Sequence, residues 1–291
     1  MSNKQPERLK KQSQIGEIWR RLRKSKTAMF GLIVLCLLIL TAIFSEQIVP
    51  YEKALAMDPM NRMAAPSREH PFGTDAFGRD MLARVLHGAR RSLAIGFLAT
   101  IGGLVVGWLV ASVATYYGGM VDTILMRITD MISAVPLTLM ALAIVSALGP
   151  TLPNLIIAIA FARIPTFARV IRSSMLGVVD MEYIEAAHAG GASALRIILT
   201  HLTPNVSGTI IVQTTMSTAQ LILIAASLSF LGLGVQLPTP EWGALLSEAR
   251  EYMRNAPQLM VYPGIFMILT SLSLNLLGDG LRDALDPKLK S

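Results

Sequence analysis

Long apolar runs, separated by short polar stretches, dominate this sequence. They cover residues 27–45, 92–121, 131–162, 197–240 and 255–278, and none of them contains a charged residue. About 20 apolar residues span a hydrocarbon core of roughly 30 Å, so each run is long enough for at least one membrane crossing. The sequence therefore predicts a protein that spans a membrane several times.

Glycine and proline show where the two longest runs divide. Gly149-Pro150 interrupts the third run, and Pro204 suits the first turn of a new helix because its missing N–H would be unpaired there. We therefore expect an all-α, polytopic membrane protein with six transmembrane helices. Their expected positions are 28–49, 92–117, 122–148, 152–170, 204–235 and 259–278.

Charge patterning orients this topology. Nine of the 26 Lys and Arg precede Thr27, and the positive-inside rule then places the N-terminus in the cytoplasm. Six crossings return the C-terminus to the same side. The loop 50–91 is then external although it carries seven Lys and Arg, against the rule. Arg163 and Arg169 fall toward the cytoplasmic end of the fourth crossing, where long side chains reach the headgroups.

Composition supports the membrane assignment and excludes other classes. Hydrophobic residues make up 53% of the 291 residues and charged residues only 15%, against about 25% charged in soluble domains. The net charge of +7 is not clustered on a face with interleaved aromatics, so no nucleic-acid partner is expected. A signal peptide at the N-terminus is disfavoured because Ser45-Glu46-Gln47 offers no small-residue cleavage site.

The predicted organisation is one transmembrane domain with short flanking segments. Its parts are a basic cytoplasmic segment 1–27, a first transmembrane helix 28–49, an external loop 50–91, a core 92–278 with five helices, a cytoplasmic loop 171–204 within that core, and a cytoplasmic tail 279–291. The loop 50–91 and the stretch 236–253 are candidate surfaces for an external protein partner.

The cytoplasmic loop predicts a compact helical corner. Asp180 is placed to cap a helix over residues 181–189, and Gly190-Gly191 is placed to end it, since glycine takes the left-handed conformation at helix ends. A second helix is expected over residues 193–202. An ordinary hairpin between crossings would have the same pattern.

The residues of this loop resemble a motif of a known protein family. Glu185-Ala186-Ala187, followed by Gly191 and Pro204, resembles the EAA loop of the membrane subunits of bacterial ABC importers. Thr203 and His201 depart from the general pattern of the EAA loop. A histidine at position 201 resembles the pattern of the dipeptide, oligopeptide and nickel branch. Further motifs resemble the C-type permease of that branch, at 73–80, 227–234, 240–243 and 277–283.

The resemblance implies a type I permease in the bacterial cytoplasmic (inner) membrane, and it implies partners. These are a second homologous permease in a heterodimer, two cytoplasmic ATPase subunits that hold ATP and Mg, and an external substrate-binding protein. Glu185, Ala186, Ala187, Gly191 and Pro204 would then couple transport to the ATPase. Di- or oligopeptides are the expected cargo, with nickel, metal chelates, glutathione or opines as alternatives.

The sequence contains no recognisable motif for nucleotide binding, catalysis or metal binding. No Gly-x-x-x-x-Gly-Lys-Ser/Thr phosphate loop occurs, and none of the eight lysines follows a glycine. Neither a catalytic residue nor a metal site is predicted, and the single Cys36 permits no disulfide within the chain. We therefore expect a transport subunit without a cofactor, and a gradient-driven transporter is the competing class.

Polar residues on the fifth crossing suggest a path. Gln213, Ser217, Gln220 and Ser227 recur at intervals of four, three and seven, so they share one helix face. They would line a hydrated path or bond to neighbouring helices, and both interpretations stay open.

Five further residues have simpler expected roles. Thr74 and Asp75 are expected to cap a helix, and Asp80 with Arg84 is spaced as an i, i+4 pair on that helix. Trp242 is expected to anchor the chain at the membrane interface.

Overall fold

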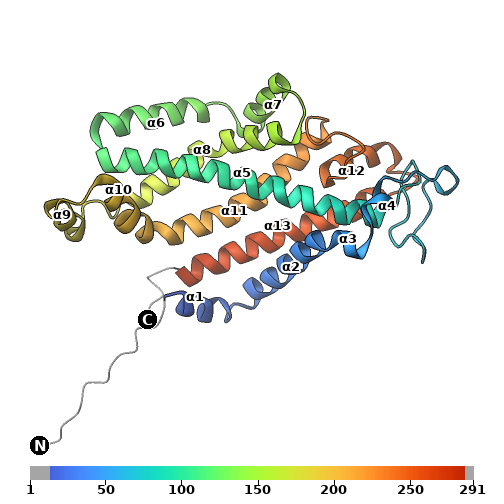
Figure 1. The fold of residues 1–291 in the computed structure, drawn as a ribbon, viewed down its shortest axis with the longest axis horizontal. Helices are drawn as coiled ribbons and strands as arrows, with labels where there is room; N and C mark the ends of the chain where they lie inside the picture. The colour runs from blue at the N-terminus through green and yellow to red at the C-terminus, as the bar shows by residue number, and fades with distance from the viewer. Residues whose placement is uncertain (1–13, 286–291) are drawn as a thin grey trace, which may run out of the picture.

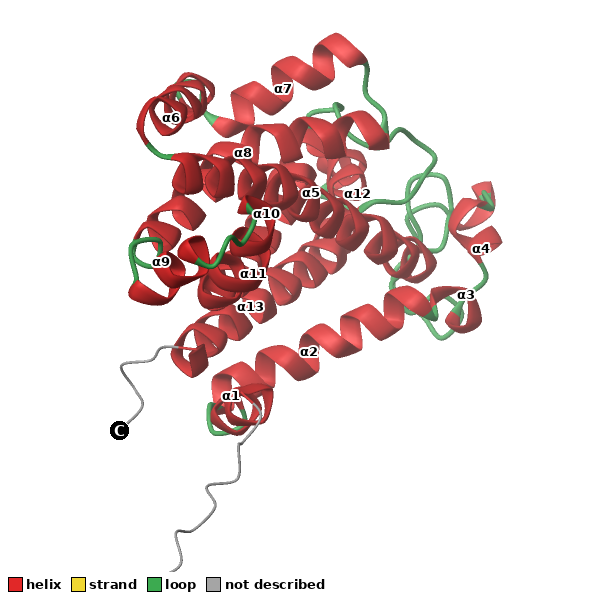
Figure 2. Cartoon of the chain, turned by 60° about the vertical axis from the view of Figure 1, so that its left-hand side comes forward, coloured by secondary structure: helices red, strands yellow, loops and turns green. Residues whose placement is uncertain are grey.

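The computed structural model of the chain describes residues 14–285, and within them the regular secondary structure is helical (Figure 2). The long helices are α2 Lys26–Ile43, α5 Met81–Tyr117, α6 Gly119–Ser133, α7 Leu137–Leu148, α8 Leu152–Leu176, α11 Thr203–Phe230 and α13 Gln258–Leu285. The short ones are α1 Gln14–Leu22, α3 Ser45–Ile48, α4 Tyr51–Leu55, η1 Pro59–Asn61, α9 Glu182–Ala189, α10 Ala194–Ile197, η2 Ile198–Leu202, α12 Trp242–Ala249 and η3 Arg250–Tyr252.

Among the described residues, five helical stretches are long and apolar enough to cross a membrane. They are α2, α5, α8, α13 and the stretch Ala194–Phe230 that contains α11. A sixth span is possible if α6 and α7, which are bent by 80° relative to each other, count as one broken crossing. The count agrees with the six predicted crossings only in this broken form.

The spans form a bundle whose two ends differ (Figure 1). α5 packs on α8 and α11, while α13 packs on α11 and α2. α1, α9 and α10 lie at one end of the bundle, which we name the α9 end. α3, α4, α12 and the loop between α4 and α5 lie at the other, the α12 end. Segments predicted to be cytoplasmic and segments predicted to be external thus gather at opposite ends.

Glycines allow α5 and α8 to approach closely. A Cβ added at Gly103 would lie 2.9 Å from the Ala160 carbonyl oxygen, and one at Gly107 would lie 2.5 Å from Phe167 Cβ. Both distances are too short for a side chain. Small residues at such contacts bring helix backbones together where lipid gives no hydrophobic drive.

The predicted helix 122–148 is wrong as one straight element. α6 ends at Ser133 and α7 begins at Leu137, with Pro136 between them at φ −53° and ψ 138°. Proline lacks an N–H and clashes with the preceding turn, so the chain turns there. Figure 2 shows α6 nearly end-on while α7 runs across the view.

Pro204 does not begin a separate helix. α10, η2 and α11 follow one another without a break, and the π turn of η2 ends directly before Thr203. A π turn changes the hydrogen-bond register within a helix, which suits the missing N–H of Pro204. The predicted helix 193–202 and the fifth crossing are therefore continuous.

Other helix ends also differ from prediction. α2 ends at Ile43 rather than near 49, and α11 ends at Phe230 rather than 235. α5 begins 11 residues early, at Met81, and α8 and α13 run on to Leu176 and Leu285. Polar helical turns beyond the apolar runs explain the longer helices. Residues 1–13 of the basic segment and 286–291 of the tail lie outside the described residues.

Candidate functional site

α9 ends in a tight glycine corner at the α9 end of the bundle. Gly191 has φ +76°, and its N–H donates to His188 O at 2.9 Å, while Ala192 N–H donates to Ala187 O at 3.0 Å. These two bonds form a Schellman motif, in which a left-handed residue satisfies the last helix carbonyls. Gly191 therefore occupies the one position of the corner that excludes most side chains.

The two faces of α9 have different surroundings. Ile184 is only 1% exposed, whereas Glu185 and Ala186 are exposed and Ala187 is half-buried. Met181 and Tyr183 add exposed apolar surface beside them. The helix thus holds to the bundle by one face and presents the other outward (Figure 1).

Apolar and aromatic contacts join α9 to the transmembrane helices. Ile184 packs in one cluster with Ile197 and Leu202 and with Phe167 and Met175 of α8. The ring of His188 stacks on Tyr116 of α5, with centroids 5.3 Å apart. A force applied to α9 would therefore reach α5 and α8 directly.

The start of α9 differs from the prediction. Met181, not Asp180, occupies the N-cap position, and no side chain caps the helix. Glu182 and Glu185 lie in its first turn, where their negative charges interact favourably with the helix dipole. The predicted loop 171–204 begins inside α8, which ends at Leu176, so its part before α9 is shorter than predicted.

A polar cluster lies at mid-height between α8 and α11. Arg163 Nη2 donates to Ser217 Oγ and to Gln220 Oε1, each at 2.9 Å, and Gln213 Nε2 lies 3.5 Å from Ser217 Oγ. Three of the four predicted path residues are therefore together. Ser227 is apart, because it is ten residues, or about 15 Å, further along the helix and bonds to Leu223 O of its own helix.

Arg163 was missed as a site residue. Its guanidinium lies against the middle of α11, and its predicted position near the headgroups stays a prediction. Arg169, two turns on, instead contacts Ser133 Oγ at 2.6 Å and Asp130 at 3.8 Å. The signal was available: a charge within a crossing marks a functional site by default.

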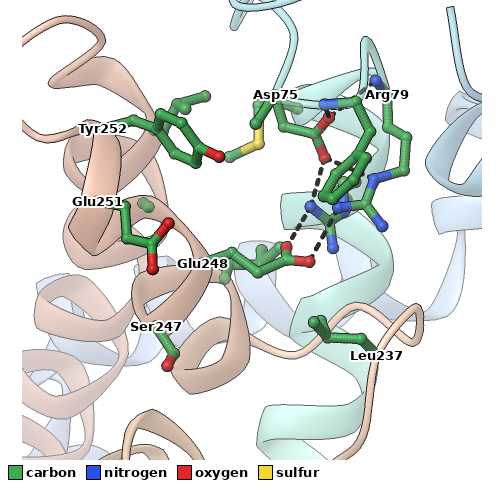
Figure 3. Close-up of a pocket in the computed structure, with 14 residues that line it drawn as sticks. Asp75, Arg79, Leu237, Ser247, Glu248, Glu251 and Tyr252 are labelled. Atoms are coloured by element: carbon green, nitrogen blue, oxygen red, sulfur yellow. Dashed lines mark hydrogen bonds and ion pairs between the residues drawn. The ribbon is translucent and has the colours of Figure 1, made fainter.

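A buried network of four charges lies at the α12 end (Figure 3). Arg79 Nε donates to Asp75 Oδ2 at 2.6 Å, and its Nη2 donates to Glu248 Oε1 at 2.9 Å. Arg84 Nη1 lies 2.5 Å from both Asp75 Oδ2 and Glu248 Oε2. Since Asp75 precedes α5 and Glu248 is on α12, these pairs hold the loop between α4 and α5, α5 and α12 together.

The network borders a cavity of about 200 Å³ (Figure 3). Apolar side chains of Phe77, Leu237, Leu245 and Leu259 line it beside the charges. Arg84 Nε and Nη2 have no hydrogen-bond partner within residues 14–285. The cavity is large enough for water to reach these groups.

This network corrects the predicted roles of two pairs. Asp80, not Thr74 or Asp75, caps α5, since its carboxylate accepts from Ala83 N at 2.8 Å. Asp80 also hydrogen-bonds His70 at 2.8 Å, so the expected pair with Arg84 does not form. Asp80 bonds to His70 and Arg84 pairs with Glu248, so the two residues do not pair with each other.

Trp242 is a buried structural residue rather than an interfacial anchor. It is 0% exposed, and its indole N–H donates to Val85 O at 3.0 Å. The neighbouring Glu241 caps α12 through Gly243 N and Ala244 N and accepts from Ser92 Oγ at 2.8 Å. The Pro-Glu-Trp-Gly motif therefore docks α12 onto α5.

The described residues give no sign of a metal centre. Within residues 14–285, no three His, Cys, Asp or Glu side chains gather in a metal-binding group.

The bundle, the broken third span and the cornered α9 define a polytopic membrane transport component. Two family models match the chain: residues 103–291 match "Binding-protein-dependent transport system inner membrane component", and residues 13–66 match "N-terminal TM domain of oligopeptide transport permease C". The chain belongs to the first family. It is a permease subunit of an ABC importer of the inner membrane, and the predicted class is confirmed.

Two relatives match almost the whole chain. One is the dipeptide transport system permease protein DppC of Alkalihalophilus pseudofirmus, 46% identical over 94% of this chain and 90% of that protein. Another is the glutathione transport system permease protein GsiD of Escherichia coli, 47% identical over 94% of this chain and 90% of that protein.

A solved structure shares the fold. It is an inward-facing conformation of the MetNI methionine ABC transporter, with a TM-score of 0.57 at 19% identity, covering 71% of this chain and 98% of that chain. The likeness extends over the whole matched chain of that transporter and supports the type I importer fold predicted from the sequence.

Proposed function

We propose that this chain forms half of a translocation pathway that imports di- or oligopeptides. The other half is a second, homologous permease, and two cytoplasmic ATPase subunits supply ATP and Mg. An external binding protein delivers the substrate to the α12 end. The N-terminus and C-terminus lie in the cytoplasm together with the α9 end.

The observation that carries the proposal is the construction of α9. Its outward face exposes Glu185 and Ala186, while its inward face buries Ile184 against α8. The Schellman corner at Gly191 sets its direction. A short helix built in this way transmits a push and offers a surface to a partner.

The mechanism follows from this rigidity. ATP draws the two ATPase subunits together, they displace α9 and α10, and the contacts of α9 with α5 and α8 carry the displacement into the membrane. Rigid-body switching of this kind converts a small shift at one site into a change of access at another. Pro204 and the π turn before it lie where α10 joins α11, on the same route.

The named cargo of the relatives supports a peptide substrate. Dipeptides and glutathione are both amide-linked amino acids with free carboxylates, and proteins named for each are about equally similar to this chain. Nickel, metal chelates and opines are competing cargoes of the same architecture. A gradient-driven transporter would need no ATPase.

The test is a reconstituted transporter in proteoliposomes that contains both permeases and both ATPase subunits. With the binding protein present, dipeptides should raise the ATPase rate and enter the vesicles only when ATP is supplied. Glutathione, nickel and a nickel chelate are the other arms of the screen. Uptake without ATP, or stimulation by none of the peptides, would contradict the proposal.

A further inference from the structure

Arg163 places a positive charge near the middle of a membrane span. It is residue 12 of the 25 in α8, and it contacts Ser217 and Gln220, which are residues 15 and 18 of the 28 in α11. Its contacts are therefore near the middle of both helices rather than at their ends. Such a charge is costly in a bilayer and is found where it faces protein or a hydrated space.

The guanidinium is only partly satisfied. Its Nη2 makes both hydrogen bonds, to Ser217 and Gln220, and its Nε is buried with no partner in residues 14–285. A guanidinium has five N–H donors and accepts none. Donors thus remain for a further group.

The countercharge is also missing from the described part of the chain. Each of the other arginines of α8 has a carboxylate: Arg169 has Asp130 at 3.8 Å, and Arg172 has Asp122 at 2.5 Å. Arg163 has only neutral partners among residues 14–285. Its positive charge is available to an anionic group.

The side chain is partly accessible. Arg163 is half-buried, and Gln220, to which it donates, is exposed, so the two side chains share one accessible polar face. The ring centroid of Phe167, one turn along α8, lies 5.9 Å from the guanidinium carbon. Polar groups on this face would be unfavourable against lipid tails, so the face borders water or protein.

We propose that Arg163 binds the carboxylate of the substrate as it passes through the permease. This inference rests on the proposed function. Ser217 and Gln220 hold the guanidinium in place through Nη2, and the N–H donors of Nη1 remain for a charge-assisted hydrogen bond to a carboxylate oxygen of the substrate. Di- and oligopeptides carry that carboxylate at the C-terminus, and glutathione carries two.

A purely structural role predicts something different. Neutral groups suffice to hold α8 against α11 through Ser217 and Gln220, and the charge would then be unnecessary. A structural clamp would affect every substrate alike. A carboxylate site would affect only substrates that have the carboxylate.

The experiment measures uptake per ATP hydrolysed in proteoliposomes with the complete transporter. The probes are the dipeptide Ala-Phe and its C-terminal amide, each saturating the binding protein. Wild type should import the free acid at least about tenfold faster than the amide, since one lost charge-assisted pair is worth that much. Arg163→Gln should slow the free acid about tenfold and import the two within about twofold of each other.

Two further variants secure the interpretation. Arg163→Lys keeps the charge and should restore free-acid uptake to within about threefold of wild type. Arg169→Gln removes a charge from the same helix away from the site and should stay within about twofold. The proposal is overturned if Arg163→Gln keeps the wild-type preference for the free acid. It is also overturned if this variant slows uptake of the acid and of the amide equally. Failure of wild type to import any peptide would instead refute the proposed function.

Discussion

The two ends of the bundle are built in opposite ways. At the α12 end, the buried Asp75, Arg79 and Arg84 and the half-buried Glu248 bond to one another, and Trp242 is also buried. At the α9 end, charged and apolar side chains of a short helix are exposed around one buried residue, Ile184.

The difference separates holding a shape from presenting a surface. Buried ion pairs gain specificity of arrangement at the cost of desolvation, and they tolerate the loss of a partner badly. An exposed helix with a fixed corner tolerates surface changes but depends on its direction. Substitutions at the α12 end should therefore affect folding, and substitutions at the α9 end should affect coupling.

The largest effect is expected at Glu248. Glu248→Gln removes the carboxylate that faces both Arg79 and Arg84, leaving excess buried positive charge. The permease should lose about 3–5 kcal/mol of stability against SDS unfolding in mixed micelles. Glu251→Gln, an exposed control three residues away, should lose less than about 0.5 kcal/mol. Equal stability of the two variants would show that the network is not structural.

The next effect is expected at Gly191. A Cβ there meets nothing within 4 Å, so Gly191→Val acts through the φ of +76° and costs about 1–2 kcal/mol of local strain. The corner should reorient, and peptide uptake should fall while the permease still inserts. Gly190→Ala is the matched control, because Gly190 has φ −74°. Similar uptake by both variants would contradict the role of the corner.

A smaller effect is expected at His188. His188→Ala removes the ring that stacks on Tyr116 and about 0.5–1.5 kcal/mol of contact between α9 and α5. Substrate-stimulated ATPase activity should fall severalfold with SDS stability nearly unchanged. His201→Ala, whose ring is tilted on Tyr183 at 6.4 Å, tests the same chemistry away from α5. If His188→Ala lowered the stability of the permease but not its ATPase stimulation, α9 would have a structural role like that of the α12 end, and its coupling role would be contradicted.

The smallest effect concerns an exposed charge at the α12 end. Hydrogen bonds from the Asn61 side chain and from Met60 N–H lower the pKa of Asp58 below its usual value. Because the folded pKa is lowered, the stabilisation of η1 is present above the unfolded pKa and is lost as pH falls through the folded one. Hydrogen exchange of the amides of residues 60–63 should quicken at low pH, after correction for intrinsic rates. Asp58→Asn should abolish this pH dependence of hydrogen exchange. If the variant kept the same pH dependence, the role of Asp58 would be contradicted.

Local signals in the sequence predicted much of the fold and the α9 corner. Apolar runs set the spans because the bilayer fixes their length, and Gly190-Gly191 marked the corner because a left-handed residue needs glycine. Pro136 also carried a signal, but the continuous apolar run around it was interpreted as one helix. The bend follows from the proline, which the length argument overlooked.

Partners far apart in the sequence could not be predicted. Arg79 and Glu248 are 169 residues apart, and the i, i+4 rule pointed instead to Asp80 with Arg84. Trp242 was assigned to the interface for the same reason, since its partner Val85 is 157 residues away. Arg163 was visible as an intramembrane charge, but its contact with Ser217, 54 residues on, needed the packing of α8 against α11.

The most direct test of the central claim uses single cysteines. In a Cys36→Ser background, Ala186→Cys on the exposed face of α9 should cross-link to an ATPase subunit in the assembled transporter. It should also resist a membrane-impermeant maleimide in intact cells. Met60→Cys, at a residue 92% exposed at the α12 end, should give the reverse on both counts. Cross-linking of the ATPase to residue 60, or maleimide labelling of residue 186 from outside, would contradict the account.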